Sequence, residues 1–392
     1  MYEEYSPIRI PDSGRTFVCS CHFKDENLRM YIERNGGSGT CTFCGKEAKV
    51  TDFANFIEHV KDVVYRYFGT LDEENLPLEF FHEDNFGFGF AKEVASETGI
   101  LNLQEPIHSL STYDLLNWLG LVTENPALNE TIEEFFDTSQ EWIRHNPLSF
   151  TDGEWVSFFW KSFCETIKSR RRFTIDEYDF VGDYYGDSLS YKDVISRIFS
   201  AIKDAQMCIT LHQGTRLYRS RAFDKEPQIL EFNDLTSAPY EYAKQNRMSP
   251  AGISMFYSSL QAKTNLAELG PTDGVIVTGR FTLKKDVRIL DLTSLPSISY
   301  WGKGNIGEME FLHDFSKEVS RPIDQDDRIH IEYLPTQAFT EYIRYRFKDL
   351  DGSSLDGIMF NSSKPIAGKN VVLFCNQDES SEYVELTDIK IQ

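Results

Sequence analysis

The sequence has no long hydrophobic run, since none of its apolar stretches reaches the roughly eighteen residues that a membrane-spanning helix needs. Its first residues, MYEEYSPIRIPDSGR, lack the basic and then apolar segments of a signal peptide. Basic residues are also few: 40 Lys and Arg stand against 62 Asp and Glu, which leaves a net charge of −22. Such a negative field repels phosphate backbones. We therefore expect a cytoplasmic protein that binds neither membranes nor nucleic acids.

Internal repeats and low-complexity tracts are absent as well. A chain of 392 residues with 41% hydrophobic content is enough for two or three packed domains. The acidic residues are concentrated, because 51–168 holds 22 acidic and six basic residues whereas 1–50 carries seven of each. These steps in charge predict an N-terminal module over 1–50 and an acidic α-helical domain over 51–172. The stretch 173–189 breaks the helical period and carries Gly182 and Gly186, so we expect a linker there and a C-terminal domain over 190–392.

The periodicity of apolar residues changes along the chain. In 52–68, DFANFIEHVKDVVYRYF, they recur with the 3.6-residue period of a helix. Similar patterns predict helices over 112–122, 130–144 and 190–207. After about residue 208 short β-rich runs alternate with helical segments, which is typical of an α+β domain. The runs interpreted as strands are 215–221, 275–283, 287–292, 329–334, 357–360 and 370–374, with helices over 261–269, 305–320 and 336–348.

The cysteines near the N-terminus have the spacing of a metal site. Cys41 and Cys44 form a C-x2-C turn followed by glycine, and Cys19 and His22 have the same spacing upstream. Because thiols stay reduced in the cytoplasm, these four residues suit tetrahedral Zn²⁺, with Cys21 as an alternative fourth ligand. Four protein ligands leave no open position. We therefore predict a structural ion in a small zinc-ribbon-like module that needs the metal to fold.

Several stretches of the C-terminal region carry a resemblance to a known family. They read GTRLYR from 214, RMSPAGI from 247, MFY from 255, TNLAE from 264, and DGI, NSS and GKNVVLF between 356 and 374. In that order and spacing, 208–392 resembles the RES domain. Members of that family are typically toxins that destroy NAD⁺, by hydrolysis or phosphorolysis, on an α+β fold similar to ADP-ribosyltransferases. The turn that begins at Arg247 departs from the family pattern, because Ser249 replaces an asparagine before the proline.

The N-terminal half resembles the zinc-containing region that precedes RES domains in longer members, the HEPN/RES N-terminal domain. The expected fold class is therefore multidomain: a zinc module, an α-helical middle region and an α+β ADP-ribosyltransferase-like RES domain.

The resemblance implies roles that fit the chemistry of NAD⁺ cleavage. Breaking the N-ribosidic bond passes through an oxocarbenium-like state that a carboxylate stabilises, while guanidinium groups hold the pyrophosphate. An aromatic ring packs against the nicotinamide ribose, and a hydroxyl orients an amide or a phosphate. The implied residues are Glu268 as the catalytic carboxylate, Arg219 and Arg247 as anion contacts, Tyr257 as the ring, and Ser362, with Ser363 beside it, as the hydroxyl.

Three functions follow from these features. The first is an NAD⁺ glycohydrolase or phosphorylase that acts as a toxin or defence effector. The second is an ADP-ribosyltransferase that modifies a macromolecule from the same pocket. The third is a zinc-containing sensor with an inactive RES-like domain. Because an NAD⁺-destroying enzyme endangers its host, we also expect restraint by the N-terminal half or by an antitoxin-like partner. The sequence is compatible with a homo-oligomer.

Overall fold

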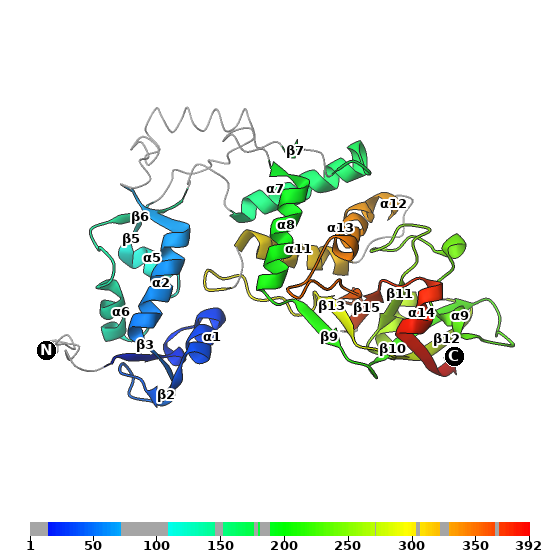
Figure 1. Cartoon of the computed structure of the whole chain (residues 1–392), viewed down its shortest axis with the longest axis horizontal. Coiled ribbons are helices and arrows are strands. Elements are labelled where there is room, and N and C mark those ends of the chain that lie inside the picture. Colours follow the sequence, from blue (N-terminus) through cyan, green and yellow to red (C-terminus); the bar gives the residue numbers. More distant parts are fainter. Residues whose placement is uncertain are drawn as a thin grey trace. The chain divides into compact units, whose positions relative to one another are not determined.

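In the computed structural model the chain folds into two compact units. Unit 1 comprises Met1–Asp152 and Ser297–Gly302, and unit 2 comprises Gly153–Pro296 and Lys303–Gln392. Unit 1 is mainly helical, and unit 2 is an α/β sheet domain (Figure 1). The described residues are 15–71, 109–145, 152–175, 179–180, 189–270, 272–302, 306–321, 329–364 and 368–392. Most of the predicted linker 173–189, and 72–108 of the predicted acidic domain, lie outside them. Within these ranges, every helix is too short or too polar to span a bilayer.

Unit 1 packs its helices against two small antiparallel sheets, with strand orders β1-β3-β2 and β4-β6-β5. Asp25 and Asp52 begin α1 and α2, because their carboxylates accept the free backbone N–H groups of the first turns. The helix predicted over 52–68 is α2, and its apolar stripe forms the centre of the core. The elements are β1 (Phe17–Cys19), a 3-10 turn (Ser20–His22), α1 (Glu26–Asn35), β2 (Gly37–Thr40), β3 (Glu47–Asp52), α2 (Phe53–Tyr67), β4 (Phe68–Thr70), β5 (Leu110–Ser111), α5 (Thr112–Trp118), α6 (Pro126–Glu133) and β6 (Glu141–Arg144).

A short segment from far along the chain, Ser297–Gly302, completes the core of unit 1. Trp301 is 6% exposed, and its indole N–H donates to the backbone carbonyl of Leu119 at 2.8 Å. Ser299 donates to the carboxylate of Asp25 at 2.7 Å, the same residue that caps α1. The stability of the N-terminal unit therefore depends on residues that lie within the C-terminal half of the sequence.

Replacing Trp301 by alanine is expected to destabilise unit 1 by about 3–5 kcal/mol. The substitution removes a buried indole and leaves the backbone carbonyl of Leu119 without its hydrogen-bond donor. Urea unfolding, with amide hydrogen exchange followed in peptides from α2 and α5, measures the effect. Tyr113→Ala is the matched control, since Tyr113 belongs to the same unit and is 53% exposed. Equal losses in the two variants would contradict a core role for Trp301.

An eight-stranded sheet with the order β16-β12-β10-β11-β15-β14-β13-β9 is the frame of unit 2. All its neighbouring strands are antiparallel except β13 and β14. Alternate residues of a strand face opposite sides, so Ile358 and Phe360 pack in one hydrophobic cluster with the long helices and Met359 packs in another. The helices of the first cluster, α7, α8, α11 and α13, gather on one side of the sheet in Figure 1.

The helix α8 shows how local sequence starts an element of unit 2. Ser190 and Asp193 form a capping box, in which each side chain accepts the backbone N–H of the other residue. The remaining bounds follow the chain: α7 (Asp152–Glu165), a π-helical turn (Thr166–Arg170), β7 (Asp179–Phe180), β8 (Leu189–Ser190), α8 (Tyr191–Asp204), β9 (Cys208–Leu211), β10 (Arg216–Phe223), α9 (Phe232–Leu235), a 3-10 turn (Tyr240–Tyr242), β11 (Phe256–Ser259), α10 (Ala262–Leu269), β12 (Val275–Leu283), β13 (Val287–Asp291), α11 (Ile306–Ser320), α12 (Ile329–Glu332), α13 (Leu334–Tyr345), β14 (Gly357–Asn361), β15 (Lys369–Leu373), α14 (Gln377–Tyr383) and β16 (Val384–Ile391).

Two predicted elements are wrong. The helix predicted over 130–144 ends at Glu133, and only the last four residues of this range form a strand, β6, which pairs with β4 and β5. Asp137 interrupts the helix, because its carboxylate accepts the N–H and hydroxyl of Ser139 and makes a turn. The strand predicted over 329–334 is helical, since α12 and α13 occupy it. Its alternating apolar residues find no neighbouring strand to pair with among the described residues, and alternation alone does not make a strand.

Candidate active site and metal cluster

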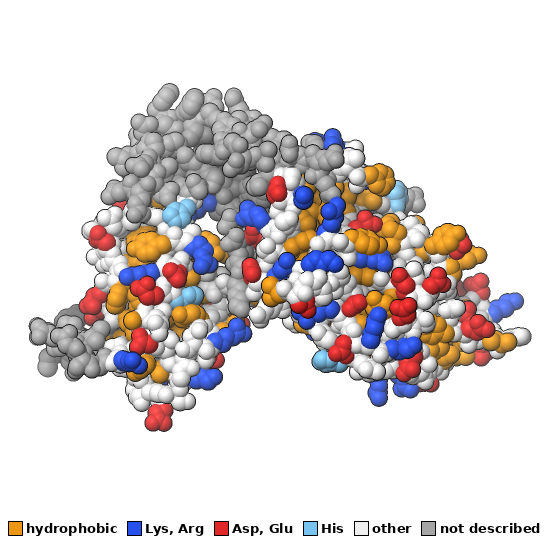
Figure 2. Space-filling view, in the orientation of Figure 1, with side chains coloured by type: hydrophobic (Ala, Val, Ile, Leu, Met, Phe, Trp, Pro, Cys, Tyr) orange, Lys and Arg blue, Asp and Glu red, His pale blue; other side chains and the backbone are white. Residues whose placement is uncertain are grey.

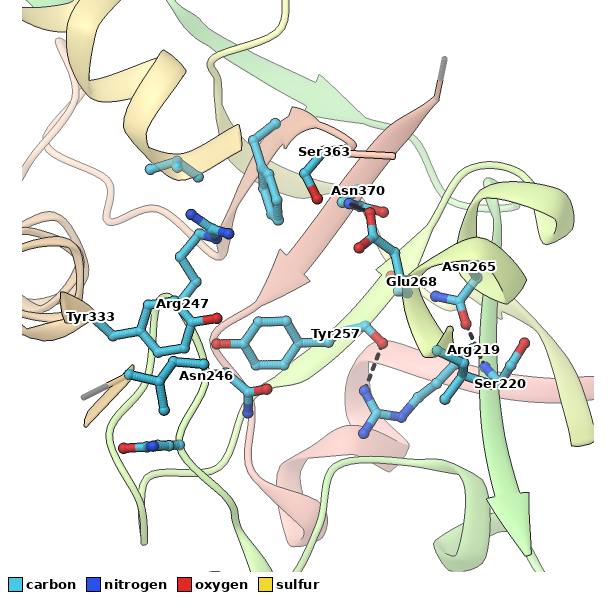
Figure 3. A pocket seen from close by; sticks show the side chains of 16 residues that line it. Arg219, Ser220, Asn246, Arg247, Tyr257, Asn265, Glu268, Tyr333, Ser363 and Asn370 are labelled. Atoms are coloured by element: carbon cyan, nitrogen blue, oxygen red, sulfur yellow. Dashed lines mark hydrogen bonds between the residues drawn. The ribbon is translucent and has the colours of Figure 1, made fainter. Parts of the chain in front are cut away.

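A cavity of about 390 Å³ lies in unit 2 among β10, β11, α10 and the residue that precedes α13. This volume is within the usual range for small-molecule sites. Ser362 lies beside the lining and donates a hydrogen bond to a lining carboxylate. The lining includes five of the predicted site residues, which come from distant parts of the sequence (Figure 3): Arg219, Arg247, Tyr257, Glu268 and Ser363.

The cavity adjoins a split in the sheet between β10 and β11. These strands pair at a single position, Tyr218 with Ser259, and the same register would place Ser220 opposite Tyr257 two residues further on. Instead, the Ser220 N–H donates to the side-chain oxygen of Asn265 at 2.5 Å, and the Tyr257 carbonyl accepts from Arg219 at 2.6 Å. Side chains thus satisfy both backbone groups that the split leaves unpaired. Arg219, a candidate site residue, is itself part of the structure that stabilises the split.

Glu268 extends from α10 to the mouth of the cavity, where its side chain is exposed. Its Oε1 accepts from the Ser362 hydroxyl at 2.5 Å and from the side-chain amide of Asn370 at 2.8 Å. Among the described residues Oε2 accepts no hydrogen bond, so it is available to a ligand. Gly368 permits this close approach of β15 to α10, because a Cβ there would lie 1.9 Å from Oγ1 of Thr264.

Arg219 is the more deeply buried cation of the cavity. Burial, with repulsion from Arg221 as the second cause, lowers the pKa of its guanidinium to about 9, so the group stays charged at neutral pH. Its Nη1 bonds the Tyr257 carbonyl, but its Nε is buried and has no partner among the described residues. No described carboxylate acts on it electrostatically. A buried, charged donor without an acceptor favours the binding of an anion.

Arg247, the second cation, is held at the C-terminal end of α11. It donates to the backbone carbonyl of Glu318 at 2.7 Å and to that of Arg321. Carbonyls at a helix C-terminus lack intrahelical partners and attract cations. The guanidinium also lies over the ring of Tyr333, 5.4 Å from its centroid. These contacts use two of the five donors of the guanidinium and fix its position.

The positive charge inside the cavity contrasts with the surface of unit 2. On the face shown in Figure 2, basic and acidic side chains of this unit are interspersed, and neither sign covers it. The charged lining residues are two basic ones, Arg219 and Arg247, and one acidic one, Glu268. The cavity therefore suits a ligand that carries a negatively charged group.

Tyr257 supplies an aromatic wall. Burial raises the pKa of its phenol to about 12, so the ring is neutral at physiological pH. The phenol oxygen and the hydroxyl of Ser249 are hydrogen-bonded at 3.0 Å, so the serine that replaces the family's asparagine anchors this ring. Tyr257 and Tyr333 point toward one another in Figure 3. Their rings offer apolar contact to a planar group.

Comparison with protein-family models gives matches over both halves of the chain. The model of the RES domain matches residues 216–390, and the model of HEPN/RES N-terminal domain 1 matches residues 34–180. The chain is a RES-domain protein with an N-terminal HEPN/RES region. The resemblance seen in the sequence is thereby confirmed. No curated protein and no solved structure matches the chain.

The RES match contains every lining residue of the cavity. The RES family is associated with toxins that degrade NAD⁺. Several lining residues had no role in the sequence-based prediction, and among them are Asn265, Tyr333 and Asn370. Both asparagines stand in the motif stretches, where an amide side chain among apolar residues was an available signal. Tyr333 gave no such signal, because the segment that carries it was predicted as a strand.

Unit 1 gathers the predicted metal ligands into one cluster. The donor atoms of Cys19, His22, Cys41 and Cys44 all lie within 4.8 Å of one another. Sγ of Cys19 is 3.6 Å from Sγ of Cys44, and Sγ of Cys41 is 3.4 Å from Nε2 of His22. Ligands about 2.3 Å from a tetrahedral ion are about 3.8 Å apart, so these donors fit a metal. Cys21 is exposed and lies outside the group of four, with its Sγ 3.0 Å from that of Cys19.

The local backbone prepares this cluster. Gly45 has a φ of 67°, and its N–H donates to the Cys41 carbonyl at 2.9 Å, which closes the turn that carries Cys41 and Cys44. Burial lowers the pKa of His22 and favours the neutral imidazole that binds metals. Burial raises the pKa of the Cys19 thiol, so its thiolate needs a neighbouring cation. A divalent ion would supply that charge.

Proposed function

We propose that the RES domain cleaves the bond between nicotinamide and ribose in NAD⁺. The observation that carries this proposal is the cavity, which combines one carboxylate, Glu268, with two guanidinium groups, Arg219 and Arg247. A dinucleotide needs cations for its pyrophosphate and a carboxylate beside the ribose that loses its base. The two tyrosines add apolar faces for the nicotinamide ring.

In the proposed reaction the pyrophosphate lies against the guanidinium groups, and the nicotinamide ribose lies beside Oε2 of Glu268. The C–N bond breaks, and both of its electrons go to the ring nitrogen, so nicotinamide leaves as a neutral molecule. The Glu268 carboxylate stabilises the positive charge that develops on the ribose. An oxygen of water or of phosphate then bonds the anomeric carbon, and a proton is released to solvent.

Incubation of the purified full chain with NAD⁺, with and without inorganic phosphate, tests the proposal. Free nicotinamide is expected in both reactions if water is the acceptor, and ADP-ribose phosphorylated at the anomeric carbon is expected if phosphate is. NAD⁺ labelled in its adenylate part distinguishes the alternative, because label on protein would indicate an ADP-ribosyltransferase. A folded protein that releases no nicotinamide would refute NAD⁺ cleavage and favour the binding or sensor function.

We also propose that the cluster of unit 1 holds a structural Zn²⁺, through Cys19, His22, Cys41 and Cys44. The support is the donor set of three thiols and one imidazole, which suits zinc better than hard cations. Because these four residues fill a tetrahedral shell, the ion would crosslink β1 to the turn after β2 and would not act on the substrate.

A further inference from the structure

A chain of buried polar side chains runs from the backbone of β10 to Glu268. The Ser220 N–H donates to Oδ1 of Asn265, and Nδ2 of Asn265 donates to Oγ of Ser259 at 3.1 Å. The Ser259 hydroxyl donates to Oδ1 of Asn370 at 2.6 Å, and Nδ2 of Asn370 donates to Oε1 of Glu268 at 2.8 Å. Ser259 is fully buried, Asn265 is 9% exposed and Asn370 is 6% exposed. We call Asn265, Ser259 and Asn370 the amide relay.

The direction of every bond in the amide relay follows from its first member. A backbone N–H can only donate, so Asn265 presents its oxygen to β10 and its NH₂ group to Ser259. The Ser259 hydroxyl accepts that bond and gives its single proton to the oxygen of Asn370. Asn370 therefore turns its NH₂ group toward Glu268. The backbone of the sheet thus dictates which end of the Asn370 amide meets the carboxylate.

This arrangement matters because Glu268 is an exposed side chain on a short helix. A free glutamate in such a place samples several rotamers, and fixing one of them costs conformational entropy. The donors from Asn370 and Ser362 both bond Oε1, which leaves Oε2 for a ligand. Figure 3 shows Asn370 beside the Glu268 carboxylate at the edge of the cavity.

We propose that Asn370 is a positioning residue for the catalytic carboxylate, oriented through the amide relay. It holds Oε1 of Glu268 so that Oε2 meets the ribose of the bound dinucleotide. This inference rests on the proposed function and deepens it, because it identifies how the reacting carboxylate is kept in one conformation before the substrate arrives. Preorganisation of this kind affects the chemical step more than the binding of substrate.

The deciding variant is Ser259→Ala, because Ser259 is buried behind Asn370 and does not line the cavity. The substitution leaves the Asn370 amide free to rotate by 180°, and we expect kcat for nicotinamide release to fall about tenfold with KM unchanged.

Asn370→Asp keeps the shape of the side chain but places a second carboxylate beside Glu268. We expect that variant to lose about a hundredfold or more in kcat, as a misplaced reacting group does.

Ser237→Ala is the matched control, since Ser237 is also fully buried in unit 2 and donates to a backbone carbonyl, that of Cys375. Thermal unfolding of all variants separates loss of fold from loss of rate. Ser259→Ala with wild-type kcat, or with no greater loss than Ser237→Ala, would overturn the relay. A raised KM at unchanged kcat in Asn370→Asp would overturn the positioning role. Absence of nicotinamide release from the wild type would instead refute the proposed function, and the inference with it.

Discussion

Glu268→Gln is expected to lower the rate of NAD⁺ cleavage by on the order of a thousandfold, with little change in stability. The substitution keeps the volume of the side chain and an oxygen that can accept from Ser362 and Asn370. It removes the negative charge that would stabilise the oxocarbenium-like state, and loss of one such electrostatic group typically costs two to three orders of magnitude. Nicotinamide release under saturating NAD⁺, measured beside thermal unfolding, gives both quantities.

Glu341→Gln is the control for this prediction, since Glu341 lies on α13 of the same unit and does not line the cavity. Its activity is expected to match the wild type. If Glu268→Gln turns over NAD⁺ at more than a tenth of the wild-type rate, Glu268 does not carry the proposed chemistry. Equal losses in both glutamine variants would point to a general effect of removing charge from this unit.

Cys41→Ser is expected to abolish binding of the proposed Zn²⁺ and to destabilise unit 1 by several kcal/mol. Structural Zn²⁺ contributes about 10–16 kcal/mol to the folding of zinc-finger peptides, and one lost ligand removes a large part of that. In unit 1 the effect is strong because the buried residues around the cluster are few: Cys19, Cys41 and Val50. Zinc content after dialysis and hydrogen exchange in β1 and β3 measure the outcome.

Two comparisons sharpen the metal prediction. Cys164→Ser removes a thiol of unit 2 outside the cluster and is expected to keep the metal. Cys21→Ser and His22→Ala separate the two candidates for the fourth ligand, and we expect only His22→Ala to lower the affinity for zinc. A full complement of zinc in Cys41→Ser would refute the proposed ligand set.

Local sequence patterns predicted helices and strands correctly where the periodicity of apolar residues agrees with the packing of the folded chain. The apolar stripe of 52–68 became α2, with its predicted apolar residues buried except for the half-buried Tyr67. The run 275–283 is β12, because branched and aromatic residues there pair with strands on both sides. The predictions over 130–144 and 329–334 failed because other interactions outweighed the periodicity. In the first a turn forms at Asp137, and in the second no described strand is available as a partner.

The sequence by itself determined the family, the four candidate metal ligands and five of the residues that line the cavity. The tertiary structure alone decided that the sheet splits beside the cavity, that Trp301 completes the N-terminal unit, and that Asn370 bonds Glu268. Each of these depends on groups far apart in the chain, such as Glu268 and Asn370, which are 102 residues apart. A hydrogen bond of that range follows from how strands pair and helices pack, and no local pattern of residues encodes it.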